Sequence, residues 1–248
     1  MGKERISITL EGGLLKRVDR LVGELADNRS NVVEVLLEEG LMHRMPKSAV
    51  VLVGGGKEAI MMQTFEDKTL IEHHVETLAS VGVENIFVVG GDIDKLRTYL
   101  ESKGVKARFL KDNNEGSAGC LRSVKDLVKN TFFIIYGDMV TGADLVDMYQ
   151  FHTRHEAIAT MGLTTTDKPG KFGVLEMKGS KVVGFAEKPE RTKSFLVNAG
   201  VFVVEPEIID MIPKGKSSME TAVVPKLIEA GKLYGYTFGG FWKDFGEE

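Results

Sequence analysis

The sequence predicts an α/β domain with a doubly wound, mostly parallel sheet, preceded by a small module of one strand and two helices. Residues 49–53 form a continuous apolar run, which is typical of a strand covered on both faces in a parallel sheet. Apolar strand-like runs then alternate with helical patterns as far as residue 136, the order expected of a sheet flanked by helices. Residues 5–10 instead alternate polar and apolar side chains, which predicts a strand with one buried face.

Composition limits the class of protein. A chain of 248 residues has room for one small module and one ordinary domain with a sizeable core. The net charge of −4 argues against broad affinity for nucleic acid, so any DNA contact should be local. A single cysteine, Cys120, excludes an internal disulfide framework, and no apolar run approaches membrane-span length. We therefore expect a soluble, cytoplasmic protein.

The first 45 residues form the small module. After the strand, apolar side chains recur at helical spacing over residues 14–26 and again over residues 32–42. The polar run between them predicts a turn, and Asn31 with Glu34 predicts a capping box for the second helix. A lone strand leaves its backbone edge unpaired, so we expect this module to form a homodimer. A tetramer of such dimers is an open alternative.

This segment resembles the ribbon-helix-helix DNA-binding family, the MetJ/Arc type, over essentially its whole length. The resemblance implies that Arg5, Ser7 and Thr9 enter the major groove of operator DNA. It also implies that backbone amides near Ser30 and Asn31 bind a DNA phosphate at the helix N-terminus. A module that only dimerises is the alternative, because residues 1–45 hold seven Lys and Arg against eight Asp and Glu.

The second domain is expected at residues 46–248, after a short linker in which Pro46 does not continue the preceding helix. Gly54-Gly55-Gly56 ends its first strand. Further strands are predicted at residues 85–89, 107–110 and 132–136, and helices at residues 68–81, 92–102 and 118–128. In such a sheet, ligands bind beyond the carboxyl ends of the strands.

Six stretches of this domain resemble the sugar-1-phosphate nucleotidyltransferases, over about residues 48–246. They are residues 68–73, the Glu-Gly-Ser-Ala-Gly of 115–119, the Gly-Asp of 136–139, the Glu-Lys-Pro of 185–189, the Asn-Ala-Gly of 197–201 and the Trp-x-Asp-x-Gly of 241–246. Each motif alone is weak, but together in this order they are specific. The resemblance implies a Rossmann-like nucleotidyltransferase fold.

The same resemblance assigns roles to individual residues. Asp138 and Asp244 would hold Mg²⁺ between the two anionic substrates, and Asp138 would also be catalytic. The nucleotide would lie against the backbone of two glycine-containing loops, because glycines allow close approach. The residues of these loops are Gly54, Gly55, Gly56, Glu115, Gly116 and Gly119. The sugar phosphate would contact Gly173, Glu187, Lys188 and Asn198.

The sequence departs from this family at its first loop. There the family has a Thr-Arg pair after the glycines and a Pro-Lys before the next helix, and these residues neutralise charge on the phosphates. Here the loop is about ten residues short by that comparison. The lysine position falls near Ile60, and Lys57 is the basic candidate that is left for catalysis.

Two functions follow from these patterns. The first is a DNA-binding transcriptional regulator whose second domain binds a nucleotide, sugar phosphate or sugar nucleotide as effector. This prediction rests on two observations. The first 45 residues resemble a DNA-binding module, and the second domain keeps the binding motifs but lacks the Arg and Lys of the family's first loop. The alternative is an active, Mg²⁺-dependent sugar-1-phosphate nucleotidyltransferase with a DNA-binding or dimerisation module attached. His152 is interpreted as a packing or solvent-exposed residue rather than as a metal ligand, and Cys120 as a small buried residue rather than as a nucleophile.

Overall fold

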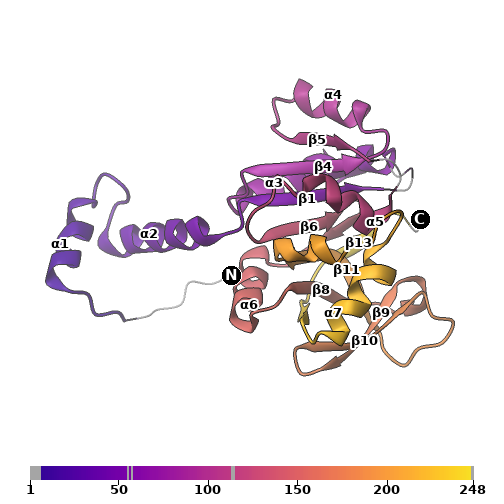
Figure 1. Ribbon diagram of the computed structural model, residues 1–248. Coiled ribbons are helices and arrows are strands. Elements are labelled where there is room, and N and C mark those ends of the chain that lie inside the picture. Colours follow the sequence, from indigo (N-terminus) through magenta and orange to yellow (C-terminus); the bar gives the residue numbers. More distant parts are fainter. Residues whose placement is uncertain (1–6, 55, 57, 113–114, 247–248) are drawn as a thin grey trace. The chain divides into compact units, whose positions relative to one another are not determined.

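Within the described part of the chain, nine strands of residues 45–248 form one mixed sheet (Figure 1). The structure is a computed structural model, and it describes residues 7–54, 56, 58–112 and 115–246. The chain separates into two compact units, residues 1–44 and residues 45–248. The strand order in the sheet is β5-β4-β1-β6-β11-β8-β12-β10-β9.

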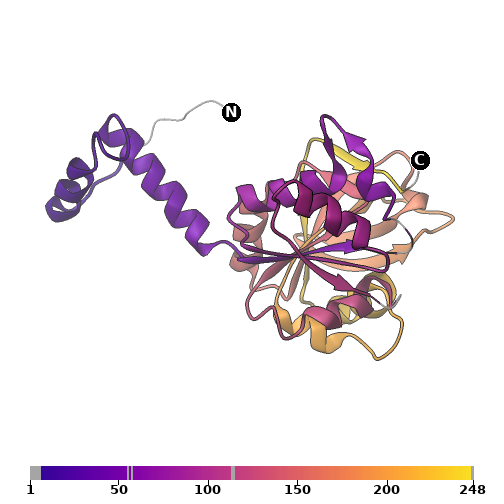
Figure 2. The same cartoon turned by 90° about the horizontal axis from the view of Figure 1, so that it is seen from above.

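The first half of the sheet is parallel. Strand β1 (Ser48–Val53) lies between β4 (Asn85–Gly90) and β6 (Phe132–Tyr136), and β5 (Arg108–Lys111) forms the edge. Residues 49–53 are all buried, because helices lie on both faces of the sheet (Figure 2). Helices α3 (Leu70–Ser80) and α4 (Asp94–Ser102) follow β1 and β4 in the chain. The predicted α/β alternation of residues 49–136 is confirmed, but in place of the single helix expected at residues 118–128 the chain forms the short helix α5 (Gly116–Gly119) and the 3₁₀ turn η2 (Cys120–Val124).

The second half of the sheet corrects the prediction of a mostly parallel sheet. Strand β11 (Leu196–Val204) is antiparallel to both β6 and β8 (Ala159–Thr165). Strands β9 (Gly173–Lys178) and β10 (Lys181–Glu187) form an antiparallel hairpin, since their two-residue connection cannot return the chain for parallel pairing. Strand β12 (Leu233–Thr237) pairs in parallel with β8.

Short elements complete this unit. Strand β7 (Met139–Thr141) pairs with β13 (Trp242–Asp244), and β2 (Thr64–Phe65) pairs with β3 (Lys68–Thr69). The remaining helices are α5 (Gly116–Gly119), α6 (Leu145–His155) and α7 (Val224–Glu229), with a π-helical turn at Met219–Val223 and 3₁₀ turns η1 (Ile60–Met62), η2 (Cys120–Val124), η3 (Pro169–Lys171) and η4 (Pro206–Met211).

The first unit contains helices α1 (Gly12–Arg20) and α2 (Arg29–Arg44). Helix α2 begins three residues before the predicted start, because the side chain of Asn28, not Asn31, caps it. Asn28 Oδ1 accepts a hydrogen bond from the Asn31 N–H at 3.0 Å. Val18 and Val32 are buried, and Arg29 pairs with Asp19 at 2.7 Å. The two predicted helices of this unit are therefore present.

The predicted N-terminal strand is not found in residues 7–10, which have no regular structure. A strand is defined by its pairing hydrogen bonds, and these residues have no partner strand among those described. Ser7 and Thr9 are exposed, Arg5 lies outside the described residues, and Ser30 and Asn31 lie in the first turn of α2. A ribbon-helix-helix module is thus not shown.

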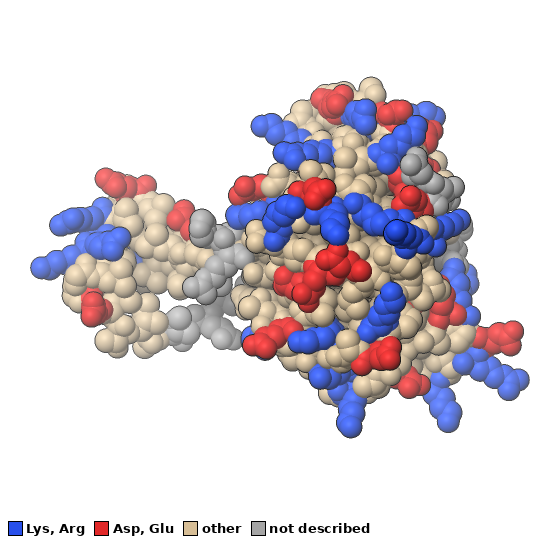
Figure 3. Space-filling model, viewed as in Figure 1, with Lys and Arg blue, Asp and Glu red and all other residues tan. Residues whose placement is uncertain are grey.

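The described helices and the visible surface add two observations. No helix in the part of the chain that the structure describes is both long enough and apolar enough to cross a membrane. On the face shown in Figure 3, Lys and Arg are interspersed with Asp and Glu in both units. This mixture agrees with the small net charge of −4.

Candidate active site

A cavity of about 380 Å³ opens at the carboxyl ends of β1, β4 and β6, where a sheet of this kind binds ligands. Its lining comes from both halves of the sheet and from β13 near the end of the described chain. The lining residues are Leu52, Val53, Gly54, Val89, Asp112, Gly116, Ser117, Cys120, Tyr136, Asp138, Met139, Lys171, Phe172, Gly173, Glu187, Lys188, Asn198, Lys216, Glu220 and Asp244. Eight of them are site residues predicted from the sequence: Gly54, Gly116, Asp138, Gly173, Glu187, Lys188, Asn198 and Asp244.

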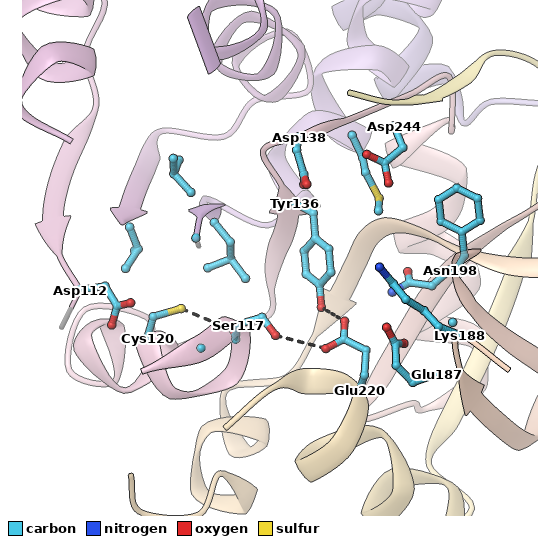
Figure 4. A pocket seen from close by; sticks show the side chains of 18 of the residues that line it. Asp112, Ser117, Cys120, Tyr136, Asp138, Glu187, Lys188, Asn198, Glu220 and Asp244 are labelled. Atoms are coloured by element: carbon cyan, nitrogen blue, oxygen red, sulfur yellow. Dashed lines mark hydrogen bonds between the residues drawn. The ribbon is translucent and has the colours of Figure 1, made fainter. Parts of the chain in front are cut away.

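Two aspartates from distant parts of the chain meet at one end of this cavity (Figure 4). Asp138 lies two residues beyond the end of β6, and the residue is 8% exposed. Antiparallel pairing places Asp244 opposite Met139, and the Phe245 N–H donates to the Asp138 backbone carbonyl at 2.8 Å. The pairing of β7 with β13 therefore brings the two carboxylates together.

The turn that carries Asp138 is held from two sides. The Gly137 N–H donates to the Leu52 carbonyl at 2.9 Å, at the end of β1. The buried His74 lies with Nε2 2.8 Å from the Gly137 carbonyl, and a carbonyl only accepts, so Nε2 carries the proton. Burial lowers the pKa of His74 to about 4, so this side chain is neutral.

The β9–β10 hairpin and β11 line another part of the cavity. Glu187 lies opposite Gly173, where an added Cβ would be 2.5 Å from the Phe185 ring and 3.1 Å from Glu187 Oε2. Glycine at position 173 therefore makes room for the Glu187 carboxylate. Asn198 is buried, and its Oδ1 accepts from the Gly200 N–H at 2.9 Å. Its amide NH₂ is thus the group that can donate to a ligand.

Lys188 follows Glu187 in a left-handed backbone conformation, with φ of 42°. Its N–H donates to the Phe172 carbonyl at 3.1 Å, which ties the end of β10 to the segment before β9. A non-glycine residue in this conformation is uncommon and costs conformational energy. The strained backbone turns the Lys188 side chain into the cavity between Asn198 and Glu187 (Figure 4).

A hydrogen-bonded cluster crosses the middle of the cavity (Figure 4). The Tyr136 hydroxyl donates to Glu220 Oε1 at 2.6 Å, and Ser117 Oγ donates to Glu220 Oε2 at 3.3 Å. Ser117 Oγ also accepts from the Met219 N–H at 3.0 Å. Burial, and then the charge of Glu220, raise the pKa of Tyr136 well above its usual range, so the hydroxyl stays a donor.

Glu220 also acts on Glu187. Burial, followed by the negative charge of Glu220, raises the pKa of the Glu187 carboxyl above its usual value, while Lys188 lowers it. Glu220→Gln removes the second of these causes and keeps an acceptor for Tyr136. We expect the acid limb of the pH profile of kcat/KM to move to lower pH in this variant, measured with the substrates proposed below. An acid limb at the same pH as in the wild type would contradict the coupling of these two carboxylates.

The other predicted nucleotide-binding residues that the structure describes, Gly56, Glu115 and Gly119, are not among the lining residues. Gly119 is buried, and its N–H donates to the Ser217 carbonyl at 3.1 Å. Glu115 forms an ion pair with Arg122. Gly56 has a φ of 79° and does not line the cavity. Gly55 and Lys57 lie outside the described residues.

Gly116 does line the cavity, and only glycine fits there. Its φ is 83°, and an added Cβ would lie 2.4 Å from the Ser217 backbone oxygen. The Ala118 N–H donates to the same oxygen at 3.1 Å, and the Ser217 N–H donates to the Glu115 carbonyl at 2.8 Å. The loop at residues 115–119 is thus fastened to the loop before the π-helical turn.

Sequence reasoning missed several lining residues. Tyr136 and Ser117 lie inside motifs that were recognised. Their place near the cavity could therefore be predicted, but their hydrogen bonds to Glu220 could not. Asp112 follows a predicted strand, and an acidic residue there was a usable signal. Glu220, Lys171 and Lys216 lie in no recognised motif, and only the folded chain brings them to the cavity.

His152 and Cys120 are packing residues, as predicted. His152 is buried, with Nδ1 2.9 Å from Thr160 Oγ1 and Nε2 3.1 Å from Glu205 Oε1. Burial, and then the charge of Asp112, raise the pKa of the Cys120 thiol to about 12, so the thiol stays protonated. A protonated thiol is a poor nucleophile, so Cys120 contributes apolar surface to the cavity.

Comparison with known proteins finds similar transferases in yeasts and plants. A mannose-1-phosphate guanyltransferase of Yarrowia lipolytica is 30% identical over 194 residues, which cover 74% of this chain and 53% of that protein. A probable mannose-1-phosphate guanylyltransferase 2 of Arabidopsis thaliana is 30% identical over 224 residues, covering 80% of this chain and 61% of that protein. The chain thus spans about half the length of the curated relatives it matches.

Two solved bacterial structures have the same fold. A putative glucose-1-phosphate thymidylyltransferase from Bacillus anthracis superposes with a TM-score of 0.73 at 20% identity, covering 80% of this chain and 89% of that one. HddC from Yersinia pseudotuberculosis, complexed with GMP-PN, has a TM-score of 0.70 at 20% identity, covering 82% of this chain and 94% of that one. These likenesses show the nucleotidyltransferase α/β fold.

The relatives correct our leading functional prediction. A DNA-binding transcriptional regulator is wrong, because the similar curated proteins are named as guanylyltransferases. The predicted contacts with operator DNA are withdrawn together with the regulator. They had been assigned to Arg5, Ser7, Thr9, Ser30 and Asn31. The regulator was predicted from the shortened first loop and the 45 N-terminal residues, whereas the six motifs indicate a nucleotidyltransferase. The enzyme, which was the alternative, is the better supported of the two functions.

The family comparison covers most of the chain. The nucleotidyl transferase family model matches residues 58–248. The match begins after β1 and the glycines that follow it, which is where the sequence departs from the family pattern. It includes Asp138, Glu187, Lys188, Asn198 and Asp244. The chain belongs to the nucleotidyl transferase family.

Proposed function

We propose that this chain is a Mg²⁺-dependent sugar-1-phosphate nucleotidyltransferase, which joins a nucleoside monophosphate to a sugar 1-phosphate. The observation that carries the proposal is the arrangement of one cavity, with Asp138 and Asp244 at one end and Glu187, Lys188 and Asn198 along its wall. Paired carboxylates suit a cation that lies between phosphates, and the other three suit the hydroxyls and phosphate of a sugar.

In the proposed reaction, a phosphate oxygen of the sugar 1-phosphate attacks the α-phosphorus of the nucleoside triphosphate. A new phosphorus–oxygen bond forms, and the bond to the β-phosphate oxygen breaks and releases pyrophosphate. Two anions approach each other in this step, so positive charge near them lowers the barrier. Lys188 faces the sugar phosphate, and the Glu187 carboxylate accepts hydrogen bonds from sugar hydroxyls. The Asn198 NH₂ donates to the sugar.

The chemistry of the donor set at Asp138 and Asp244 fits Mg²⁺. Magnesium in phosphoryl-transfer sites is held by one or two carboxylates, with water and substrate phosphate oxygens as the other ligands. Among the described residues, no group of three or more His, Cys, Asp and Glu is arranged to hold a metal ion. When bound, Mg²⁺ would supply charge neutralisation at the phosphates.

Lysines around the cavity offset the short first loop. Lys171, Lys188 and Lys216 line the cavity, and they come from segments outside that loop. They are our candidates for the positive charge that the family obtains from its loop Arg and Lys. Lys57 remains a candidate from the loop itself, and Gly54 and Gly116 are proposed to lie against the nucleotide. The same holds for Gly55, Gly56, Glu115 and Gly119.

The test is pyrophosphate release by the full-length protein with Mg²⁺. A panel of nucleoside triphosphates and sugar 1-phosphates is used, with GTP and mannose 1-phosphate first because of the names of the relatives. Release that requires both substrates and Mg²⁺ is the expected result. No release with any pair, from a protein that is folded by circular dichroism, would refute the proposed activity.

We further propose that residues 1–45 and 46–248 are separate domains and that the cavity works without the first. All of its lining residues belong to the second unit. A chain that starts at Met45 is therefore expected to keep at least about half of the pyrophosphate release of the full chain, since the removed residues supply none of the cavity lining. A folded truncated protein with less than a tenth of that rate would contradict this independence.

A further inference from the structure

The residues proposed to bind the sugar phosphate and Mg²⁺ leave one end of the cavity unassigned. The side chains at that end are of a different kind. Figure 4 shows Asp112 and Cys120 on the side of Ser117 that faces away from Lys188 and Asn198. The lining residues from the ends of β1 and β4, the two strands that follow β5 in the sheet, are apolar: Leu52, Val53 and Val89. A flat nucleobase fits such a wall, and the edge of the base would then meet the one carboxylate.

Asp112 is held in place by the fold. It follows β5, and its N–H donates to the Gly90 carbonyl at 2.7 Å. A side chain at position 90 would not fit here, because an added Cβ would lie 2.4 Å from the Val53 backbone oxygen. The Asp112 carboxylate accepts the Glu115 N–H at 3.2 and 3.3 Å. One shared N–H leaves both carboxylate oxygens with acceptor capacity.

The neighbouring polar side chains are already engaged. Ser117 Oγ donates to Glu220 and accepts from the Met219 N–H. The Cys120 thiol lies 3.5 Å from the Ser117 carbonyl, to which it donates. Of the described lining residues at this end, Asp112 is therefore the one whose charged carboxylate can accept hydrogen bonds from a nucleobase.

The bases differ in what they present to a carboxylate. Guanine offers two adjacent donors, N1–H and the 2-amino group, which match the two oxygens of a carboxylate as a bidentate pair. Uracil and thymine offer one N–H between two carbonyl oxygens, which a carboxylate repels. Adenine and cytosine offer an amino group beside a ring-nitrogen lone pair, which it also repels. A carboxylate thus favours guanine through attraction and disfavours the other bases through repulsion.

We propose that Asp112 is the specificity-determining residue for the nucleobase and that it selects guanine through N1–H and the 2-amino group. This inference rests on the proposed function, because it assumes that the cavity binds a nucleoside triphosphate. It adds the class of triphosphate and the side chain that reads it.

The test is equilibrium binding of nucleoside triphosphates to the full-length protein with Mg²⁺ and no sugar phosphate, measured by calorimetry. For the wild type, GTP is expected to bind at least about tenfold more tightly than ITP, which lacks the 2-amino group, and more tightly still than ATP or UTP. Asp112→Asn keeps the shape and an acceptor for the Glu115 N–H. It is expected to weaken GTP binding by about a hundredfold.

The same variant also gives a gain of binding. Xanthine carries a carbonyl oxygen where guanine has its 2-amino group, so the amide of Asn matches xanthine with one acceptor and one donor. Asp112→Asn is therefore expected to bind XTP more tightly than GTP, whereas the wild type prefers GTP. A loss of fold cannot produce this reversal.

Asp126→Asn is the matched control, because the Asp126 side chain is 97% exposed and lies outside the cavity lining. It is expected to keep the wild-type order of the bases. If the wild type binds another triphosphate best, or Asp112→Asn keeps the preference for GTP over XTP, the role of Asp112 is refuted and the proposed activity stands. If the wild type binds no triphosphate, both are refuted.

Discussion

Asp138→Asn is expected to lower the rate of pyrophosphate release by about a thousandfold, because several kcal/mol of charge stabilisation at the phosphates are lost. Asp138 is 8% exposed and lines the cavity, so its carboxylate is available to the space in which the substrates are proposed to bind. The backbone carbonyl of residue 138 still accepts the Phe245 N–H, so the fold of the turn should persist. The measurement is a coupled pyrophosphate assay at saturating Mg²⁺.

The second carboxylate provides a strong internal check. Asp244→Asn is expected to cause a similar loss, and the double variant is expected to be little worse than either single one, because the two act as one site. Asp94→Asn, at a side chain that is 76% exposed in α4, is the control and should retain the wild-type rate. A wild-type rate in Asp138→Asn would remove this carboxylate from the proposed metal site.

His74→Gln is expected to remove a large part of the acid sensitivity of the fold. The pKa of His74 is about 4 in the folded protein and 6.5 as the ordinary value, because burial disfavours the charged ring. Between these values the unfolded chain binds a proton that the folded chain does not, so the free energy of unfolding decreases as pH falls from 6.5 to about 4. This one group accounts for a decrease of about 3 kcal/mol.

Glutamine can still donate to the Gly137 carbonyl but does not titrate over this range. Urea unfolding of both proteins at pH 7 and at pH 4 gives two differences in free energy. At pH 7 His74 is neutral in the folded protein and mostly neutral in the unfolded chain, so the difference there reports mainly packing and the hydrogen bond. At pH 4 the variant should have lost about 3 kcal/mol less than the wild type. Equal losses would show that the His74 side chain does not stay neutral in the fold.

The two halves of the sheet were not equally predictable. Residues 49–53 and 132–136 show their buried strands directly, because parallel strands that are covered on both faces are apolar throughout. Beyond residue 136, the antiparallel pairing of β11 with β6 and β8 depends on contacts between strands that are far apart in sequence. Local patterns carry no information on such pairing, so the mixed sheet was missed.

The N-terminal prediction failed for a related reason. The alternating pattern of residues 5–10 satisfies the condition for a half-buried strand, but a strand also needs a partner with which to pair. Residues 7–10 have none among the described residues. Asn28 replaced Asn31 as the cap of α2, because two polar residues close together can each cap, and geometry decides between them.

The sequence by itself determined the family, the α/β alternation and the residue types of the site, because motifs and hydrophobic periods are local properties of the chain. Asp138, Glu187, Lys188, Asn198 and Asp244 could all be named from their motifs. Only the tertiary structure decided that Glu220 joins Tyr136 and Ser117, that Lys171 and Lys216 face the same cavity, and that Asp112 stands at its far end. Glu220, Lys171, Lys216 and Asp112 come from segments without a motif, and contacts made by distant strands and loops bring them to the cavity.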